Sequence, residues 1–220
     1  MTTRHHPSDE LLLDYSSGAL GEAWSLAIAT HAALCSQCRH SISFMENIGG
    51  SLLDEISPDA INPSDFDDLL SRLNTTADEE KVSSEEVPAN TSRPMLPQPL
   101  RGYLGCDIDQ LKWRPMGLGA YQIIIPTSET GVTARLLRIP KGRPVPEHSH
   151  GGLELTVLLA GAFSDSTGNY GRGDLQEADE TLRHQPHAAP GEDCICLAIT
   201  DAPLKFSSFG VRLVQPWLHI

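Results

Sequence analysis

Side chains of the kinds that bind metal follow one another at helical spacing near the N-terminus. His31, Cys35 and Cys38 stand at positions i, i+4 and i+7, so a helix would direct all three side chains to one face. One imidazole and two thiolates supply three of the four ligands that a tetrahedral zinc ion requires. A fourth ligand must come from elsewhere, and the N-terminus offers His5 and His6. The spacing predicts a structural zinc site, with two buried thiols and a surface histidine as the alternative.

A second group of possible metal ligands lies in the C-terminal half. His148 and His150 are two residues apart, so on a strand their side chains point the same way, and Glu154 follows at even spacing. A strand that returns across a barrel could add His184, for which His187 is a competitor. Two imidazoles and a carboxylate suit zinc, iron, manganese, nickel or copper. This pattern predicts a divalent transition-metal site rather than scattered surface histidines.

The elements expected to position the first group are helices. The first begins after Ser8 as its cap and ends near Gly18; the second covers residues 22–34. The third runs from about residue 36 toward residue 48, where a pair of glycines weakens it, and the fourth starts with Ser64 as its cap. Residues 1–76 thus predict a small four-helix domain, a size at which a bound metal commonly adds stability.

The fourth expected helix carries an apolar stripe. Phe66, Leu69, Leu70 and Leu73 stand at i, i+3, i+4 and i+7. A stripe of this spacing either joins the core of the domain or forms a docking face for a partner.

The pattern changes from helical to strand-like after residue 100. Residues 77–99 are charged and then proline-rich, which is typical of a flexible linker. Beyond them, short runs rich in β-branched residues alternate with turn signals, which is typical of a sandwich or jelly roll over residues 100–220. The expected strands are 121–126, 133–140, 153–160, 194–200 and 211–214. The fold class predicted is an α + β chain of two domains.

Charge and apolar content limit the possible partners and the compartment. The formal net charge is −13, and residues 1–86 carry almost all of it. This argues against non-specific binding of nucleic acid and favours a basic protein partner. No apolar run approaches the length of about 18 residues that spans a bilayer, and no signal peptide opens the chain. We expect a cytoplasmic protein that binds neither nucleic acid directly nor a membrane.

The chain has five cysteines, an odd number without a framework spacing, which argues against a disulfide scaffold. Cys194 and Cys196 stand two apart on an expected strand, so both thiols can face one side. They are either redox sensors or metal ligands, or ordinary buried residues of the strand.

The N-terminal motif resembles a known family. A histidine near the N-terminus followed by His-x3-Cys-x2-Cys is similar to the zinc-binding anti-sigma domain, a four-helix domain that binds a group IV (extracytoplasmic-function, ECF) sigma factor and blocks its access to RNA polymerase. The resemblance implies zinc ligands at His6, His31, Cys35 and Cys38. It also implies that the fourth helix, with Phe66, Leu69, Leu70 and Leu73, docks separately onto the sigma factor.

The C-terminal motif resembles the cupin signature. Gly142-x5-His148-x-His150-x3-Glu154-x6-Gly161 matches its first part at every position. The second part departs from the pattern, because residues 179–181 replace its Pro-x-Gly and Ala188 replaces its terminal asparagine. Gly173 and His184 keep their offset. The resemblance implies metal ligands at His148, His150, Glu154 and His184, holding zinc or another divalent transition metal.

The two motifs in one chain are similar to the ChrR family of soluble anti-sigma factors. This resemblance implies a transcription regulator rather than an enzyme. It would inhibit an ECF sigma factor and release it under singlet oxygen or related oxidative stress, sensed through the cupin metal site. The alternative is a metal-dependent cupin dioxygenase or isomerase with an N-terminal protein-docking domain.

Overall fold

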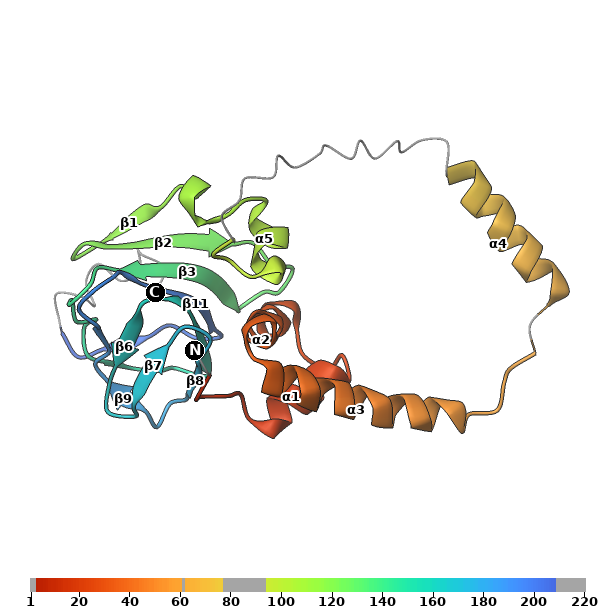
Figure 1. Ribbon diagram of the computed structural model, residues 1–220, viewed down its shortest axis with the longest axis horizontal. Coiled ribbons are helices and arrows are strands. Elements are labelled where there is room, and N and C mark those ends of the chain that lie inside the picture. The colour runs from red at the N-terminus through yellow and green to blue at the C-terminus, as the bar shows by residue number, and fades with distance from the viewer. Residues whose placement is uncertain (1–2, 61, 77–93, 209–220) are drawn as a thin grey trace. The chain divides into compact units, whose positions relative to one another are not determined.

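The structure, a computed structural model, describes residues 3–60, 62–76 and 94–208 (Figure 1). The chain forms two compact units: residues 1–47 together with 94–220, and residues 48–93. The first unit thus combines segments that are far apart in the sequence. Most of the expected linker, residues 77–93, and the expected strand 211–214 lie outside the described residues.

The N-terminal helices form where the sequence predicts them. Helix α1 (Asp9–Ser16) starts after Ser8, whose hydroxyl accepts a hydrogen bond from the backbone N–H of Leu11. Two carboxylates in its first turn favour the positive end of the helix dipole. Gly18, with φ +73°, follows its end. Helix α2 (Glu22–Leu34) matches the expected bounds and places His31 in its last turn.

The next two helices differ from expectation at their ends. Helix α3 (Ser36–Asp54) continues through Gly49 and Gly50 rather than ending there, because a helical glycine costs only about 1 kcal/mol. Helix α4 (Pro63–Thr76) begins at proline, whose fixed φ suits the first helical position. Ser64, the expected cap, therefore lies inside the helix. Among the described residues, no helix combines the length and the apolar character needed to cross a membrane.

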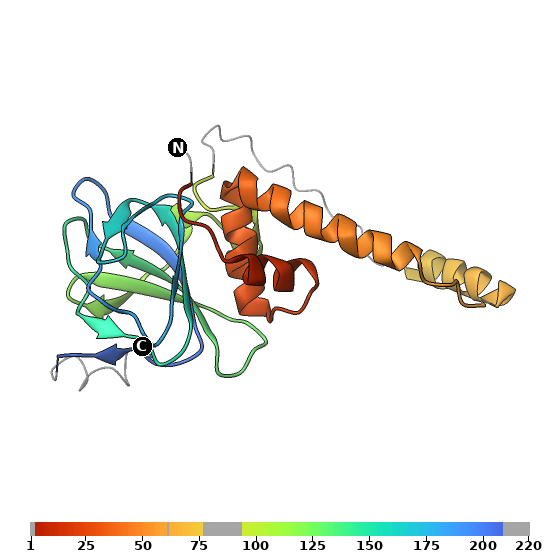
Figure 2. The ribbon, with the colours of Figure 1, turned by 90° about the horizontal axis from the view of Figure 1, so that it is seen from below.

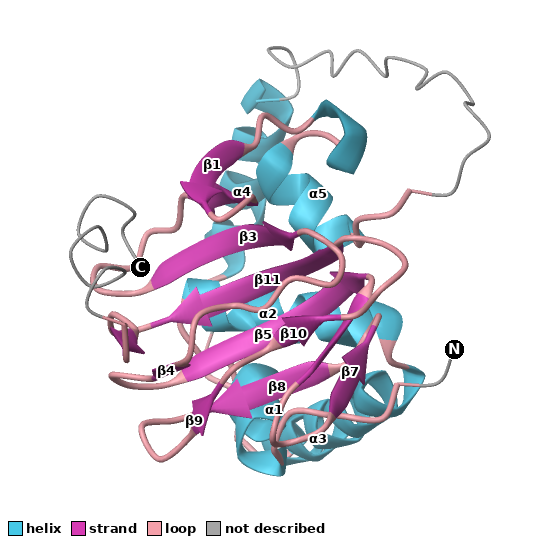
Figure 3. Cartoon of the chain, turned by 90° about the vertical axis from the view of Figure 1, so that its left-hand side faces the viewer, coloured by secondary structure: helices cyan, strands magenta, loops and turns pink. Residues whose placement is uncertain are grey.

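The C-terminal part consists of antiparallel sheets, as the strand pattern predicts (Figure 3). Among the described residues the largest sheet has six strands, and the expected strands 121–126, 133–140, 153–160 and 194–200 correspond to four of them. In spatial order they are β1 (Arg114–Gly117), β2 (Ala120–Ile125), β3 (Thr133–Ile139), β11 (Cys194–Thr200), β5 (Glu154–Ala160) and β8 (Leu175–Ala178). One three-stranded sheet contains β10 (His187–Ala188), β6 (Ala162–Ser164) and β7 (Asn169–Gly171). The other contains β12 (Lys205–Phe206), β4 (His148–Ser149) and β9 (Arg183–His184).

The central strands β5 and β11 are buried on both faces. On β11, Cys194 and Cys196 belong to a cluster inside the barrel, whereas Leu197 and Ile199 join a second cluster on the opposite face of the sheet. Helix α2 covers that opposite face, and its Ile28 is fully buried there (Figures 1 and 3). The N-terminal helices and the sheet therefore share one apolar core.

Residues 94–99, the end of the expected linker, lie in the first unit. Leu96 is buried, and its backbone N–H and that of Met95 donate hydrogen bonds to the carboxylate of Asp107. Helix α5 (Gln98–Leu104) follows and packs on α2, and a short 3₁₀ helix covers Ile108–Gln110. The chain thus re-enters the core before the first strand.

Two carboxylates fix the start of α2. Gly21 at its N-cap has no side chain, and Glu129, from the loop between β2 and β3, accepts a hydrogen bond from the N–H of Ala23 at 2.5 Å. Glu22 in turn accepts from the backbone N–H of Ser128 at 2.6 Å. These contacts, together with the shared core, orient the helix that carries His31.

The shared core leads to a first prediction. Replacing Ile28 by alanine should lower the free energy of unfolding by about 2 to 5 kcal/mol, because the cavity lies between α2 and the sheet. Urea unfolding of the full chain measures this value. The control is Leu13→Ala on α1, where the side chain is 54% exposed and a change within about 0.5 kcal/mol is expected. Equal effects of the two substitutions would contradict a shared core.

Candidate metal centres

The structure brings four metal-binding side chains of the N-terminal segment together. The ligand atoms of His6, His31, Cys35 and Cys38 all lie within 4.8 Å of one another. The Nδ1 atom of His6 is 3.4 Å from the Sγ of Cys35 and 3.3 Å from the Sγ of Cys38, and the Nε2 of His31 is 3.2 Å from the Sγ of Cys38. We call these four residues the head cluster.

Local structure explains the convergence in the head cluster. His31 lies at the end of α2, Cys35 in the turn that follows, and Cys38 in the first turn of α3. The break between the two helices falls at Cys35, as their expected bounds predict, and Cys35 has an extended backbone (φ −114°, ψ 110°). The three side chains therefore do not leave one face of a single helix. The three side chains still converge, because the N–H of Cys38 donates to the Sγ of Cys35 at 3.5 Å across the turn.

Burial makes an uncompensated charge in the head cluster energetically unfavourable. His31, Cys35 and Cys38 are at most 3% exposed. Burial lowers the pKa of His31 to about 4, so its imidazole is neutral and has a free lone pair. Burial and a hydrogen bond with Cys35 raise the pKa of Cys38 to about 12. The Cys38 thiol therefore ionises only with a compensating cation.

The spacing of the head cluster fits a tetrahedral ion. Zinc–sulfur and zinc–nitrogen bonds of about 2.3 and 2.0 Å place neighbouring sulfur and nitrogen ligands about 3.5 Å apart. The three nitrogen–sulfur distances, 3.2 to 3.4 Å, are close to that value. His5, the competing N-terminal histidine, lies outside the cluster, with its Nδ1 3.4 Å from the carboxylate of Asp174.

Three histidines of the barrel form a second group. His148, His150 and His184 are all buried. The Nε2 of His184 is 3.1 Å from that of His148 and 3.2 Å from that of His150. Ligands at about 2.0 to 2.1 Å from one metal would be roughly 3.0 to 3.4 Å apart. We call these three residues the barrel cluster.

Pairing between remote strands builds the barrel cluster. Strand β4 pairs with β9 so that His148 stands directly opposite His184. Both strands have only two residues, and this pairing is why His184, rather than His187, lies in the cluster. His187 is exposed on β10, and its Nδ1 is 2.9 Å from the carbonyl oxygen of Gln185.

The outer nitrogens of the barrel cluster face acceptors. The Nδ1 of His148 donates to the carbonyl oxygen of Pro146 at 2.8 Å, and that of His184 donates to the Oδ2 of Asp165 at 2.6 Å. Such contacts fix the tautomer, so that Nε2 keeps its lone pair for a metal. Burial opposes ionisation of Asp165, but hydrogen bonds from Thr167, Gln176 and His184 outweigh it and lower the pKa of Asp165 to about 2.

Glu154 lies beside the three histidines without joining their group. Its Oε2 is 3.7 Å from the Nδ1 of His150, and its Oε1 accepts a hydrogen bond from the hydroxyl of Thr156. Burial raises the pKa of Glu154 to about 7. The carboxylate thus lies near the outer nitrogen of His150 but beyond hydrogen-bond distance, unlike Asp165, which accepts a hydrogen bond from His184.

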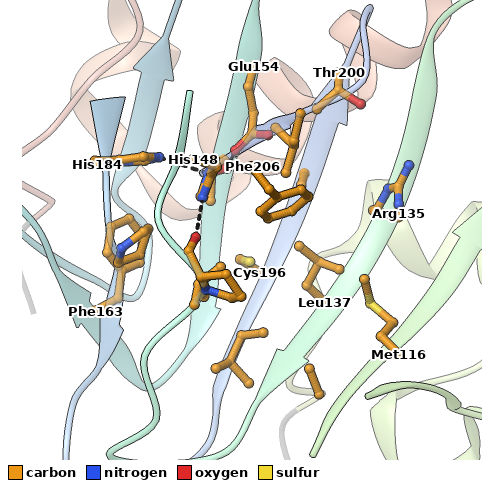
Figure 4. A pocket seen from close by; sticks show the side chains of 18 of the residues that line it. Met116, Arg135, Leu137, His148, Glu154, Phe163, His184, Cys196, Thr200 and Phe206 are labelled. Atoms are coloured by element: carbon orange, nitrogen blue, oxygen red, sulfur yellow. Dashed lines mark hydrogen bonds between the residues drawn. The ribbon is translucent and has the colours of Figure 1, made fainter. Parts of the chain in front are cut away.

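The barrel cluster opens onto a large cavity of about 980 Å³. Figure 4 shows His148, His184 and Glu154 on one part of its wall, and Leu137 and Met116 on another. Cys194 and Cys196 also line the cavity, so both thiols face the same side of β11, as expected. A hydrogen bond with Cys194, together with burial, raises the pKa of Cys196, so this thiol stays protonated.

Sequence reasoning missed two features. One is Asp165, which no motif marks and which tertiary contacts alone identify. The other is a second exposed apolar stripe, Ile48 and Leu52 on α3, whose i, i+4 spacing was a detectable signal. On α4 the predicted stripe is exposed: Phe66, Leu69, Leu70 and Leu73 keep between 41% and 64% of their surface accessible.

The fold and the two clusters define a class of protein in which N-terminal helices that carry the head cluster are joined to a cupin-like barrel. Residues 102–202 match the ChrR cupin-like domain. The chain is 44% identical over 220 residues to the Anti-sigma-E factor ChrR of Cereibacter sphaeroides, covering 100% of both proteins. It also matches, with 42% identity and a TM-score of 0.75, the crystal structure of Rhodobacter sphaeroides SigE in complex with the anti-sigma ChrR, covering 91% of this chain and 100% of that chain. The chain belongs to the ChrR family, which confirms the resemblance drawn from the motifs.

Proposed function

We propose that this protein is an anti-sigma factor that binds and inhibits a group IV (ECF) sigma factor. The observation that carries the proposal is the full-length similarity to a protein named as an anti-sigma factor, together with the similarity to an anti-sigma ChrR whose crystal structure is in complex with SigE. The same similarity favours a regulator over the enzyme considered as an alternative. Mixing the purified chain with its cognate sigma factor tests the proposal: a stable complex that stops transcription by the holoenzyme supports it, and unchanged transcription refutes it.

The head cluster would hold zinc. Two thiolates and two imidazoles are a common ligand set of structural zinc, and their burial and spacing here fit a tetrahedral ion. The metal, when bound, would cross-link the N-terminal arm, the end of α2 and the start of α3. His6, His31, Cys35 and Cys38 are the proposed ligands, and the helices they join would present the inhibitory surface.

Helix α4 would supply a separate docking face. Its stripe of Phe66, Leu69, Leu70 and Leu73 is exposed, and apolar faces of this kind bury themselves in partner grooves. The strongly acidic balance of residues 1–86 adds attraction to a basic partner surface. In this scheme residues 1–76 bind the sigma factor and residues 100–220 sense the signal. Of the expected linker 77–99, residues 77–93 connect the two, because residues 94–99 belong to the first unit.

The docking face gives a second prediction. Replacing Phe66 and Leu70 together by serine should weaken sigma-factor binding by about 30-fold or more, because central apolar anchors dominate such interfaces. Fluorescence anisotropy measures the dissociation constant, and circular dichroism checks that the helix content is unchanged. Leu118→Ser, at a 74% exposed position on the barrel, is the control. Equal dissociation constants for the two variants would exclude α4 from the interface.

The barrel cluster would sense the signal. A buried group of three histidines beside Glu154 and a large cavity gives an oxidant or ligand access to a metal of the zinc, iron, manganese, nickel or copper type. We propose that singlet oxygen or a related oxidative stress changes this site and releases the sigma factor. Such a change acts only if it stabilises the free and bound states differently.

A further inference from the structure

The barrel holds the arm that supplies His6 to the head cluster. Asp174 lies in the turn between β7 and β8, and its Oδ1 accepts hydrogen bonds from the backbone N–H groups of Arg4 and His5 at 2.6 and 3.1 Å. The N–H of Leu175 donates to the carbonyl oxygen of His5 at 3.1 Å. Strand β8 is an edge of the six-stranded sheet, so the arm covers part of that edge. Figure 2 shows the N-terminal residues running along the barrel before α1.

Further contacts fix the arm on both sides of His6. The ring of His5 packs on Tyr170 with centroids 4.2 Å apart. After His6, the N–H of Ser8 donates to the carboxylate of Glu177. Gly173 has φ +97°, which favours glycine, and an added Cβ would lie only 3.1 Å from the hydroxyl of Thr3. The position of His6 therefore depends on strand β8.

The same strand also reaches the barrel cluster. Gln176 is buried two residues after Asp174, and its Nε2 donates to the Oδ2 of Asp165 and to the Oγ1 of Thr167, both at 2.8 Å. The Oδ2 of Asp165 also accepts from the Nδ1 of His184. Both side chains of that last pair are at most 1% exposed. Hydrogen bonds thus run from His184 through Asp165 to Gln176. The backbone at Leu175 then connects Gln176 to Asp174, which holds the arm.

We propose that Asp165, Gln176 and Asp174 are positioning residues that couple the two clusters. When the barrel cluster is filled, Asp165 and Gln176 hold β8 in the register that places the arm, and His6 completes the head cluster. When the barrel cluster is altered, β8 shifts and the arm loosens. This inference rests on the proposed metal sites, and it explains how a change in the barrel cluster would reach the head cluster. Coupling of this kind is reciprocal, so metal in either cluster tightens metal in the other.

The test monitors metal binding in the head cluster of the full chain through the reactivity of the thiols in that cluster. Metal-bound thiolates resist alkylation, so the alkylation rate of Cys35 and Cys38, read by peptide mass spectrometry, reports loss of metal from that cluster. The rate is measured with the barrel cluster intact and after His148→Ala/His150→Ala. We expect this change to accelerate alkylation by about tenfold in the otherwise unchanged chain.

The positioning residues are tested by variants that leave every proposed ligand in place. Gln176→Met keeps the side-chain volume and removes both hydrogen bonds. In that background, emptying the barrel cluster should change the alkylation rate by about twofold or less. Asp174→Ala should by itself accelerate alkylation by about tenfold, because the backbone N–H groups of Arg4 and His5 lose their acceptor. The control is Asp193→Ala, which removes a carboxylate bound to Arg138 and Lys141, away from the arm. In this control, emptying the barrel cluster should still accelerate alkylation by the full tenfold.

The outcomes separate this inference from the proposed function. A metal count by mass spectrometry is made on each protein first. Metal in both clusters, with the same acceleration in Gln176→Met as in the unchanged chain, would overturn the coupling alone. Absence of metal at Cys35 and Cys38 in the unchanged chain would overturn the proposed head site, and the coupling with it.

Discussion

Replacing Cys35 and Cys38 together by serine is expected to empty the head cluster and to weaken sigma-factor binding by about 100-fold or more. Serine hydroxyls are poor zinc ligands, and structural zinc contributes its binding free energy directly to folding. Without the metal, the arm, the end of α2 and the start of α3 lose their common attachment. The two measurements are a metal count on the purified full chain and the dissociation constant of its complex with the sigma factor.

The burial and the histidine contacts of Cys35 and Cys38 make this prediction specific to these two cysteines. Both thiols are buried in direct contact with histidine nitrogens. Cys106, by contrast, is only partly buried and lies outside both clusters. Cys106→Ser is therefore the control, and we expect it to keep the metal and the affinity. Equal sigma-factor binding by the double variant and the unchanged chain would remove the structural role proposed for the metal.

Replacing His148 and His150 together by alanine is expected to abolish the response to singlet oxygen. The measured quantity is the ratio of sigma-factor release rates with and without singlet oxygen from an illuminated photosensitiser. We expect this ratio to fall from about tenfold or more to about one, because a signal shifts an equilibrium only through a site that differs between the states. The ratio of the two release rates is used because emptying the barrel cluster also changes the rate of sigma-factor release without singlet oxygen.

A matched histidine provides the control for this response. His187 lies near the cluster in sequence but is exposed on β10 and outside the group. His187→Ala removes an oxidisable imidazole without touching the three buried ones, so its release ratio should equal that of the unchanged chain. A normal ratio in the His148/His150 variant would show that the sensor lies elsewhere. A lost ratio in His187→Ala would point to His187 itself as a residue that the response requires.

The amino-acid sequence by itself determined the elements and most of the members of each cluster. Helical spacing on α2 and α3 indicated His31, Cys35 and Cys38, and alternation at His148 and His150 indicated the second pair. Apolar runs at residues 153–160 and 194–200 indicated the strands β5 and β11. These inferences succeed because residues a few positions apart in the chain stay close in space, even across the break between α2 and α3.

Only the tertiary structure decided which residues complete the clusters and what positions them. His6 rather than His5 faces the thiols because strand β8 and Asp174 hold the backbone of His5. His184 stands opposite His148 because two very short strands pair, and Asp165 meets His184 from another strand connection. Each of these contacts joins segments far apart in the chain. Their geometry depends on how α2 and the sheet share one apolar core, and no local pattern records that packing.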